Sequence, residues 1–153
     1  MSNNGRLKVI PSVFTLIEKD GKYLLLRRKN TGYMDGWYDL PAGHLEDQEK
    51  LKDGAIRELK EEANLKTEPN YLKLVHVYQN HTNEPPHYGF IFLADKWTGA
   101  PKIMEPGKCD DLAWFGPQDL PEKTLPYTKQ AIENLADFKE VGISYHEPRS
   151  ITG

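Results

Sequence analysis

The stretch from Gly43 to Leu65 constrains this chain more than any other part of it. Leu51, Ala55 and Leu59 recur every four residues, which is the spacing of one apolar face of an α-helix, and Ile56 widens that face. The stretch therefore predicts an amphipathic helix that packs its apolar face against a core.

Three acidic side chains share one edge of this predicted helix. At about 100° per residue, Glu58, Glu61 and Glu62 project over an arc of about 100° beside the apolar face, with Glu62 nearest the core. Like charges at these spacings destabilise a helix by about 0.2–0.5 kcal/mol per pair, and the C-terminal end of a helix favours cations. Because Arg57 can neutralise only part of this charge, a cation from outside the helix is expected.

The chemistry of the three acids indicates which cation this would be. Carboxylate oxygens with no His or Cys among them suit a hard divalent ion, Mg2+ or Mn2+ before Zn2+. The alternative is a solvated acidic face, which is the usual meaning of a run of charges. The spacing of the residues around the acids argues against that alternative.

That spacing is G-x5-E-x7-R-E-U-x-E-E-x-G-U, where U is a bulky aliphatic residue, and it resembles the signature of the Nudix hydrolases. Eight of its nine defined positions fit between Gly43 and Leu65. The exception is Asn64, where the family has Gly. That Gly ends the helix in the left-handed conformation, and Asn is the next most tolerant residue there. The preceding segment, Trp37 to Gly43, resembles the family's W-x-x-P-G-G entry, with Ala42 for the first glycine of the pair.

The resemblance implies a fold and a reaction. The fold is of the α/β class, a Nudix fold with a mixed β-sheet in an α/β/α sandwich, formed by one domain over residues 1–153. The reaction is attack of water on one phosphorus of a nucleoside diphosphate joined to another group X. Such hydrolysis gains most from positioning and from neutralisation of charge by bound Mg2+.

The resemblance also implies roles for the acidic residues. The ion would be held by Glu58, Glu61, Glu62 and the carbonyl group of Ala42. In such relatives a Glu in a loop after the signature adds a metal ligand or a base. Glu105 is the candidate for this role here, and the alternative is that it is a solvated loop acid. Glu58 or Glu61 would accept the proton of the attacking water, and the two are not separated. Glu49, at the start of the helix, and Arg57 would orient the carboxylates.

Further residues would contact the substrate. In the MutT-like branch an Arg at the position of Arg28 contacts the nucleotide phosphates, and a solvated strand end is the alternative. Tyr33 stands where one relative has a His. Asp110 and Asp111 could read base edges, although a turn role is the plainer interpretation.

The sequence favours one substrate class without excluding others. Nudix enzymes that act on ADP-ribose or on dinucleoside polyphosphates carry a marker Pro or Tyr after the signature. Neither residue is clearly placed around His81 to Glu84 in this chain. The segment from Leu112 to Leu135 also resembles the tail of MutT-like nucleotide hydrolases. Together these observations favour a nucleoside triphosphate, canonical or oxidised, cleaved to the monophosphate and pyrophosphate. An ADP-sugar or dinucleoside polyphosphate is the alternative substrate. A catalytically silent nucleotide-binding domain and a purely structural acidic helix are the alternative functions.

Composition bounds the partners. The net charge of -3, with mixed signs, gives no basic face for polymeric nucleic acid. The single cysteine, Cys109, excludes an internal disulfide and is expected to be unreactive. No apolar run is long enough to span a membrane, and Met1 to Arg6 lacks the apolar core of a signal peptide. We expect a cytoplasmic protein, monomeric or homodimeric, whose partner is a small nucleotide.

The remaining elements follow from local patterns. Two apolar segments around a turn at Lys19 to Gly21 predict a hairpin of strands buried on both faces. The histidines between the later strands are interpreted as polar loop residues, and Val141 to Gly153 shows no recognisable chemistry. The expected elements are hairpin strands at 9–17 and 23–26, strands at 71–78 and 88–93 with Val75, Val77, Phe90 and Phe92 inward, a short strand at 112–115 and a helix at 128–135.

Overall fold

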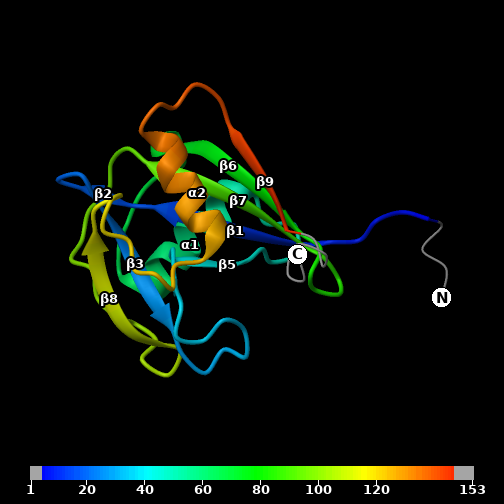
Figure 1. Ribbon diagram of the computed structural model, residues 1–153, viewed down its shortest axis with the longest axis horizontal. Coiled ribbons are helices and arrows are strands. Elements are labelled where there is room, and N and C mark those ends of the chain that lie inside the picture. The colour runs from blue at the N-terminus through cyan, green and yellow to red at the C-terminus, as the bar shows by residue number, and fades with distance from the viewer. Residues whose placement is uncertain (1–4, 147–153) are drawn as a thin grey trace.

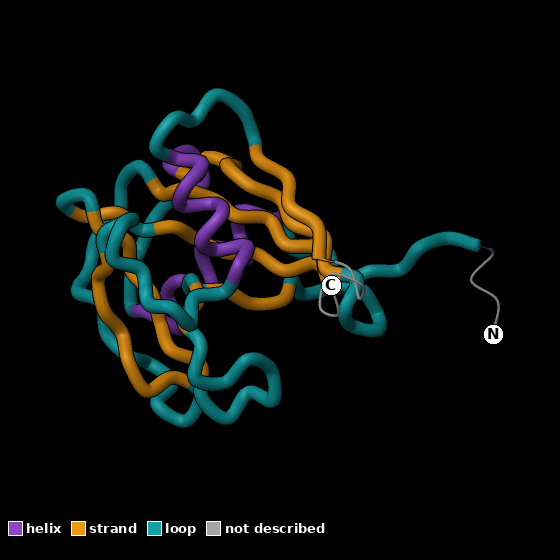
Figure 2. Tube along the Cα trace, in the orientation of Figure 1, coloured by secondary structure: helices purple, strands orange, loops and turns teal. Residues whose placement is uncertain are grey.

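Nine strands and two α-helices occupy residues 5–146, which are the residues that the computed structural model describes (Figures 1 and 2). A short 3-10 helix, Pro69–Tyr71, precedes the sixth strand. The elements in chain order are β1 (Ile10–Leu16), β2 (Glu18–Lys19), β3 (Lys22–Arg28), β4 (Tyr38–Asp39), β5 (Ala42–His44), α1 (Leu51–Ala63), β6 (Leu72–Asn80), β7 (His87–Ala94), β8 (Cys109–Phe115), α2 (Pro126–Leu135) and β9 (Gly142–His146).

A mixed five-stranded sheet with the order β5-β1-β7-β6-β9 forms the centre of the fold. β1 lies parallel to β7 and antiparallel to β5, and β6 lies antiparallel to β7 and parallel to β9. The side chains of β1 alternate between two cores: Val13 joins the core under α1, whereas Phe14 joins the core under α2. A helix on each face of a mixed sheet confirms the predicted α/β sandwich.

A second, antiparallel sheet consists of β2, β3, β4 and β8, with β3 paired to the other three. The first strand of the predicted hairpin was therefore wrong, because β3 pairs with the short β2 and not with β1. Both edges of β1 are already paired, with β5 and β7, so the chain leaves the first sheet at Ile17. The carbonyl group of Ile17 accepts a hydrogen bond from the Leu24 N–H group at 3.1 Å, which joins the two sheets.

The predicted amphipathic helix is confirmed as α1. Ala55 and Leu59 are fully buried, and Asn64 ends the helix in the left-handed conformation, with φ 62° and ψ 30°. The helix begins at Leu51, so Glu49 precedes it and does not open it. The last carbonyl groups of the helix accept hydrogen bonds from the segment 102–104, which passes across the helix end.

The later elements differ from the prediction mainly in length. β6 and β7 match the predicted strands and extend beyond them, but only Val75 and Phe92 of the four expected inward side chains are buried; Val77 and Phe90 are half-buried. A bulge between Leu74 and His76 changes which side chains face each core.

The C-terminal strand was not predicted. β9 pairs in parallel with β6 and completes the sheet, within the stretch from Val141 onward where no element was expected. The rest of that stretch, residues 147–153, lies outside the described residues, as do residues 1–4 of the segment considered for a signal peptide. Among the described residues, no helix has the length and apolar character needed to cross a membrane.

Candidate active site

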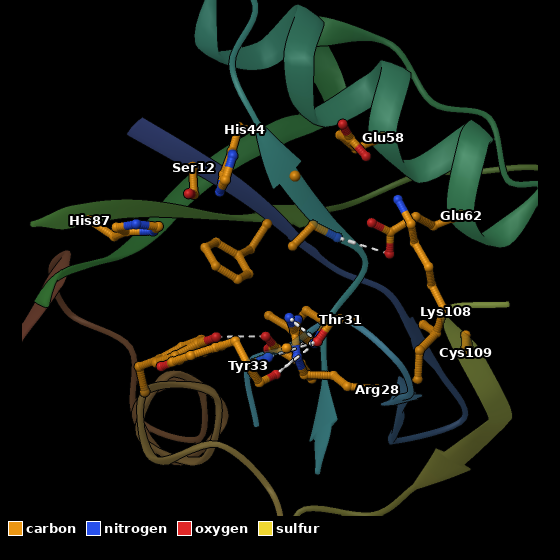
Figure 3. A pocket seen from close by; sticks show the side chains of 18 of the residues that line it. Ser12, Arg28, Thr31, Tyr33, His44, Glu58, Glu62, His87, Lys108 and Cys109 are labelled. Carbon is orange, nitrogen blue, oxygen red and sulfur yellow. Dashed lines mark hydrogen bonds between the residues drawn. The ribbon is translucent and has the colours of Figure 1, made fainter. Parts of the chain in front are cut away.

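A cavity of about 780 Å3 lies beside α1 and is lined by residues of both sheets and of the loops after β3 and before β8 (Figure 3). Its position explains why some predicted site residues meet and others do not. Those that line it are Arg28, Tyr33, Ala42, Glu58, Glu62 and Glu105, whereas Glu49, Arg57, Glu61, Asp110 and Asp111 do not line it.

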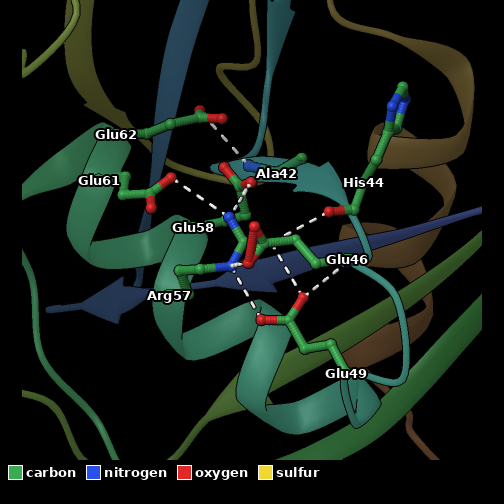
Figure 4. Close-up of polar contacts among 8 residues, drawn as sticks. All are labelled: Ala42, His44, Glu46, Glu49, Arg57, Glu58, Glu61 and Glu62. Atoms are coloured by element: carbon green, nitrogen blue, oxygen red, sulfur yellow. Dashed lines mark hydrogen bonds and ion pairs between the residues drawn. The ribbon is translucent and has the colours of Figure 1, made fainter.

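Arg57 is the centre of a network of charged groups beside the cavity (Figure 4). Its Nε and Nη2 atoms donate to the two oxygens of Glu49, at 2.8 and 3.0 Å, in a forked arrangement. Its Nη1 atom donates to Glu58 at 2.7 Å and to Glu61 at 3.3 Å, and Nη2 also reaches the carbonyl oxygen of His44 at 3.0 Å. One guanidinium group thus ties α1 to β5 and to the loop between them.

These contacts set the charge state of neighbouring acids. The guanidinium group of Arg57 lowers the pKa of Glu49 below its ordinary value. Burial raises the pKa of Glu58, because desolvation outweighs the hydrogen bond and the charge of Arg57. Arg57 stands four residues before Glu61, yet its shorter bond is to the adjacent Glu58, because the guanidinium group bends back toward β5.

Glu62 is an acid of the site that has little compensation for its charge. Desolvation by burial, followed by the charge of Glu58 and, more weakly, that of Glu105, raises its pKa well above the ordinary value. Its carboxylate accepts a hydrogen bond from the Ala42 N–H group at 3.4 Å, and it forms no ion pair with any described residue. A half-buried carboxylate near two other carboxylates is a place where a cation is favourable.

The donor groups fit a hard divalent cation. Glu58, Glu62 and Glu105 all line the cavity and offer carboxylate oxygens, the ligands that Mg2+ and Mn2+ prefer. Glu61 projects away, with a side chain 53% exposed. Among residues 5–146, no three His, Cys, Asp or Glu side chains are placed so that together they could hold a metal ion without moving.

Arg28 and Tyr33 form another part of the cavity wall. The Arg28 Nε atom donates to the Tyr33 carbonyl oxygen at 2.6 Å, and Nη2 donates to Thr31 Oγ1 at 3.0 Å. The guanidinium carbon also lies 5.4 Å from the centre of the Tyr33 ring. The Tyr33 hydroxyl group in turn accepts a hydrogen bond from Asn80 at 3.4 Å. Arg28 therefore holds the loop after β3 and still has N–H groups left for a ligand.

Asp110 and Asp111, which were considered for base reading with a turn role as the plainer interpretation, lie in β8 and outside the cavity lining. Asp110 pairs with Arg27 at 2.7 Å on the surface, and this contact lowers its pKa. Asp111 accepts a hydrogen bond from the hydroxyl group of Tyr38. Because β8 is paired with β3 here, both carboxylates join neighbouring side chains of the second sheet, outside the cavity lining. Their placement favours a structural role over contact with a base.

Several lining residues were missed from sequence. Asp39 is buried and accepts hydrogen bonds from Tyr127 at 2.6 Å and Thr128 at 2.7 Å, and burial raises its pKa. The rings of His44 and His87 lie 5.5 Å apart at the cavity wall, so His87 is not merely a polar loop residue. An acid within an apolar segment was the one available signal for Asp39; the histidine pair arises only through the sheet.

Comparison with known proteins agrees with this geometry. The model of the NUDIX domain family matches residues 7–137. An ADP-ribose pyrophosphatase of Methanocaldococcus jannaschii is 31% identical over 128 residues, covering 81% of this chain and 73% of that protein. The 8-oxo-dGDP phosphatase NUDT18 of Homo sapiens is 34% identical over 115 residues, 74% of this chain and 33% of that protein.

Two further similarities bear on length and fold. The NAD-capped RNA hydrolase NudC of Pseudomonas putida is 25% identical, over 86% of this chain but 44% of its own length. This chain thus spans less than half of NudC and of NUDT18. The crystal structure of a MutT NUDIX hydrolase from Burkholderia pseudomallei superposes with a TM-score of 0.75 at 27% identity, covering 82% of this chain and 97% of that one. With its fold, its row of carboxylates and the family match together, this chain belongs to the Nudix hydrolases, a family that acts on phosphoanhydride bonds.

Proposed function

We propose that this protein hydrolyses a phosphoanhydride bond of a nucleoside diphosphate joined to a further group X, with Mg2+ as its cofactor and Mn2+ as a substitute. The observation that carries this proposal is the arrangement of charge around one cavity. Glu58 and Glu62 lie on one side of it and Arg28 on the other (Figure 3). An ion held by the acids and phosphates held by the arginine fit this pairing of opposite charges.

The carboxylates in the cavity would hold the ion, and one of them would also accept a proton. Glu58, Glu62 and Glu105 would hold the cation, which when bound neutralises phosphate charge and lowers the pKa of water. Of the two candidates for proton acceptor, Glu58 lines the cavity, whereas Glu61 is exposed and hydrogen-bonded to Arg57. We therefore assign the proton transfer to Glu58. Nudix hydrolases in general use divalent cations, which supports the proposed Mg2+ cofactor.

Glu49 and Arg57 act through other groups. Glu49 fixes the guanidinium group of Arg57 with two hydrogen bonds, and Arg57 fixes one oxygen of Glu58. The other oxygen of Glu58 stays available to the ion or to water. These two residues are positioning residues whose removal would let the Glu58 carboxylate rotate.

A nucleoside triphosphate is the first candidate substrate. Tyr33 lines the cavity next to the phosphate-binding side chain of Arg28 and offers an aromatic ring near a base, whereas the rings of Tyr78 and Tyr127 are buried and stack on each other. The similarity to NUDT18, which is named an 8-oxo-dGDP phosphatase, supports an oxidised nucleotide among the candidates. ADP-ribose is the second candidate, because the archaeal relative named ADP-ribose pyrophosphatase matches 81% of this chain.

One experiment tests the function and separates the substrates. The purified protein is incubated with nucleoside triphosphates, 8-oxo-dGTP, ADP-ribose and dinucleoside polyphosphates, with Mg2+ and with a chelator. Products are identified by 31P NMR, and Glu58→Gln serves as the control for a contaminating enzyme. We expect Mg2+-dependent release of pyrophosphate from a triphosphate. Hydrolysis of ADP-ribose alone would select the second candidate, and no hydrolysis of any compound would support the silent nucleotide-binding alternative.

A further inference from the structure

Among the described residues, three Lys and Arg side chains line the cavity, and two of them already have partners. Arg27 pairs with Asp110, and Arg28 donates to the loop after β3. The third, Lys108, forms no ion pair and no side-chain hydrogen bond with any residue from 5 to 146. Among the three, Lys108 therefore has the one charged group with no side-chain partner in residues 5–146, and its ammonium group is available to a ligand.

The backbone of Lys108 is held firmly although its side chain is free. Its N–H group donates to the carbonyl oxygen of Glu105 at 2.9 Å, which closes a turn, and its carbonyl oxygen accepts from Lys29 at 2.9 Å. The neighbouring Gly107 carbonyl group accepts from Asn30 at 3.4 Å. These contacts join the loop before β8 to the end of β3, so the side chain starts from a fixed point at the cavity wall.

From that point the Lys108 side chain extends toward Glu62 (Figure 3). Glu62 has no cationic partner among the described residues, and the ammonium group does not come within 4.0 Å of it to form an ion pair. Two uncompensated opposite charges thus face each other across a gap. A ligand that fills the gap would present positive charge to Glu62 and negative charge to Lys108.

We infer that Lys108 forms a phosphate subsite that binds the oxygens of a phosphate group joined, through a divalent cation, to the carboxylates of α1. This inference rests on the proposed function, since it assigns one phosphate of the same substrate. A lysine ammonium group is a compact charge with three donors and needs no bidentate geometry to hold a phosphate. Arg28 and Lys108 would then grip different phosphate groups of one nucleotide.

The competing interpretation is that Lys108 stands in for the metal ion. In that case removal of the lysine would strengthen Mg2+ binding to the ligand-free protein. In a phosphate subsite, removal weakens binding of phosphate ligands and leaves Mg2+ affinity unchanged. The two interpretations therefore predict different Mg2+ affinities for the variant without a phosphate ligand, and they can be separated without measuring turnover.

The test is calorimetric titration of Lys108→Ala, Lys108→Arg and Lys102→Ala. The probes are MgCl2 alone, pyrophosphate with Mg2+, and an α,β-methylene nucleoside triphosphate with Mg2+. Lys102 lies on the same loop and is exposed but does not line the cavity, so it is the matched control. We expect Lys108→Ala to weaken both phosphate ligands about three- to tenfold, with less salt dependence, and the other two variants to bind like wild type.

The outcomes fall on one side or the other. Equal affinity of Lys108→Ala and wild type, absence of pyrophosphate binding by wild type, or tighter Mg2+ binding by the variant would each overturn the subsite. Weaker ligand binding by Lys108→Ala in a protein that hydrolyses none of the panel would support the subsite and contradict the proposed function. Hydrolysis with unchanged ligand affinity would do the reverse.

Discussion

The carboxylate of Glu58 lies directly against the Cα atom of Gly43. A Cβ atom at Gly43 would overlap the Cδ atom and both oxygens of Glu58. Gly43 is not in the positive-φ region, so glycine is needed here for space and not for conformation. The position of the Glu58 carboxylate in the cavity therefore depends on the absence of one methyl group at Gly43.

Replacement of Gly43 by Ala is expected to displace Glu58 while the protein remains folded. The added methyl group collides with the end of a side chain and not with backbone, so the carboxylate moves and the helix stays. We expect turnover to fall at least about 100-fold, since misplacement of a catalytic group by about 1 Å has this effect. Steady-state kinetics and circular dichroism check both parts.

A second glycine variant controls for the loss of glycine itself. A methyl group at Gly107 would meet no atom within 4 Å, and this residue does not have a positive φ, so Gly107→Ala should turn over like wild type. Wild-type turnover in Gly43→Ala would show that the Glu58 carboxylate need not occupy its present place.

Arg57→Lys is expected to lower both turnover and stability. A lysine keeps the charge but cannot reproduce the fork that holds Glu49 while also reaching Glu58. We expect turnover about 10- to 100-fold lower and an unfolding free energy about 1–2 kcal/mol lower, measured by urea denaturation. Glu61→Gln alters only the longest of these contacts, at 3.3 Å, and should leave the unfolding free energy nearly unchanged. Equal stability of Arg57→Lys and wild type would contradict the orienting role.

Asn64 is expected to tolerate Gly but not Ala. Its φ of 62° lies in the left-handed region, which costs a residue with an ordinary side chain about 1–2 kcal/mol. Asn64→Ala should therefore lower the unfolding free energy by about 1 kcal/mol or more, and it also removes the side-chain bond to the Ala100 carbonyl oxygen at 3.3 Å. Asn64→Gly should match or slightly exceed wild type. If chemical denaturation shows Ala to be as stable as Asn, the helix end has another conformation in solution.

Much of the fold could be predicted because it depends on local patterns. The i, i+4 spacing of Leu51, Ala55 and Leu59 defines α1, and the conformational tolerance of Asn64 defines its end. The pairing of β1 could not be predicted in this way. A strand buried on both faces shows no alternation that identifies its partners, and its neighbours β5 and β7 are decided by contacts distant in sequence.

The site was predictable to the same degree. Helix periodicity places Glu58, Glu61 and Glu62 on one edge, but only the position of β5 decides that Glu61 faces solvent. The role of Lys108 could not be predicted from the sequence, because the position of its side chain depends on a loop that is hydrogen-bonded to the end of α1 and to the end of β3. Asp110 and Asp111 lie in a strand and not in the turn that was the plainer interpretation, and strand pairing, which chain order does not reveal, determines what each side chain meets.

The raised pKa of Glu62 has a consequence for stability that can be given a sign. A carboxyl group whose pKa in the folded protein lies above its unfolded value favours folding while it is protonated, and that contribution is lost as the pH rises through the folded pKa. Above that pH the desolvated, charged Glu62 opposes folding, since neither Glu58 nor Glu105 can neutralise it. A divalent cation would remove this cost, and it competes with the proton for the same oxygens.

Glu62→Gln is therefore expected to raise the melting temperature of the metal-free protein at pH 8 and to change it little at about pH 4, where the wild-type group is protonated. If the gain is about 1 kcal/mol, the shift is about 2–4 °C for a chain of this size. Mg2+ should stabilise wild type more at high pH than at low pH, and stabilise Glu62→Gln less. Thermal unfolding across this pH range, with the exposed Glu61→Gln as the control, measures all of these effects. Identical pH profiles for Glu62→Gln and wild type would mean that Glu62 is already compensated without a metal ion.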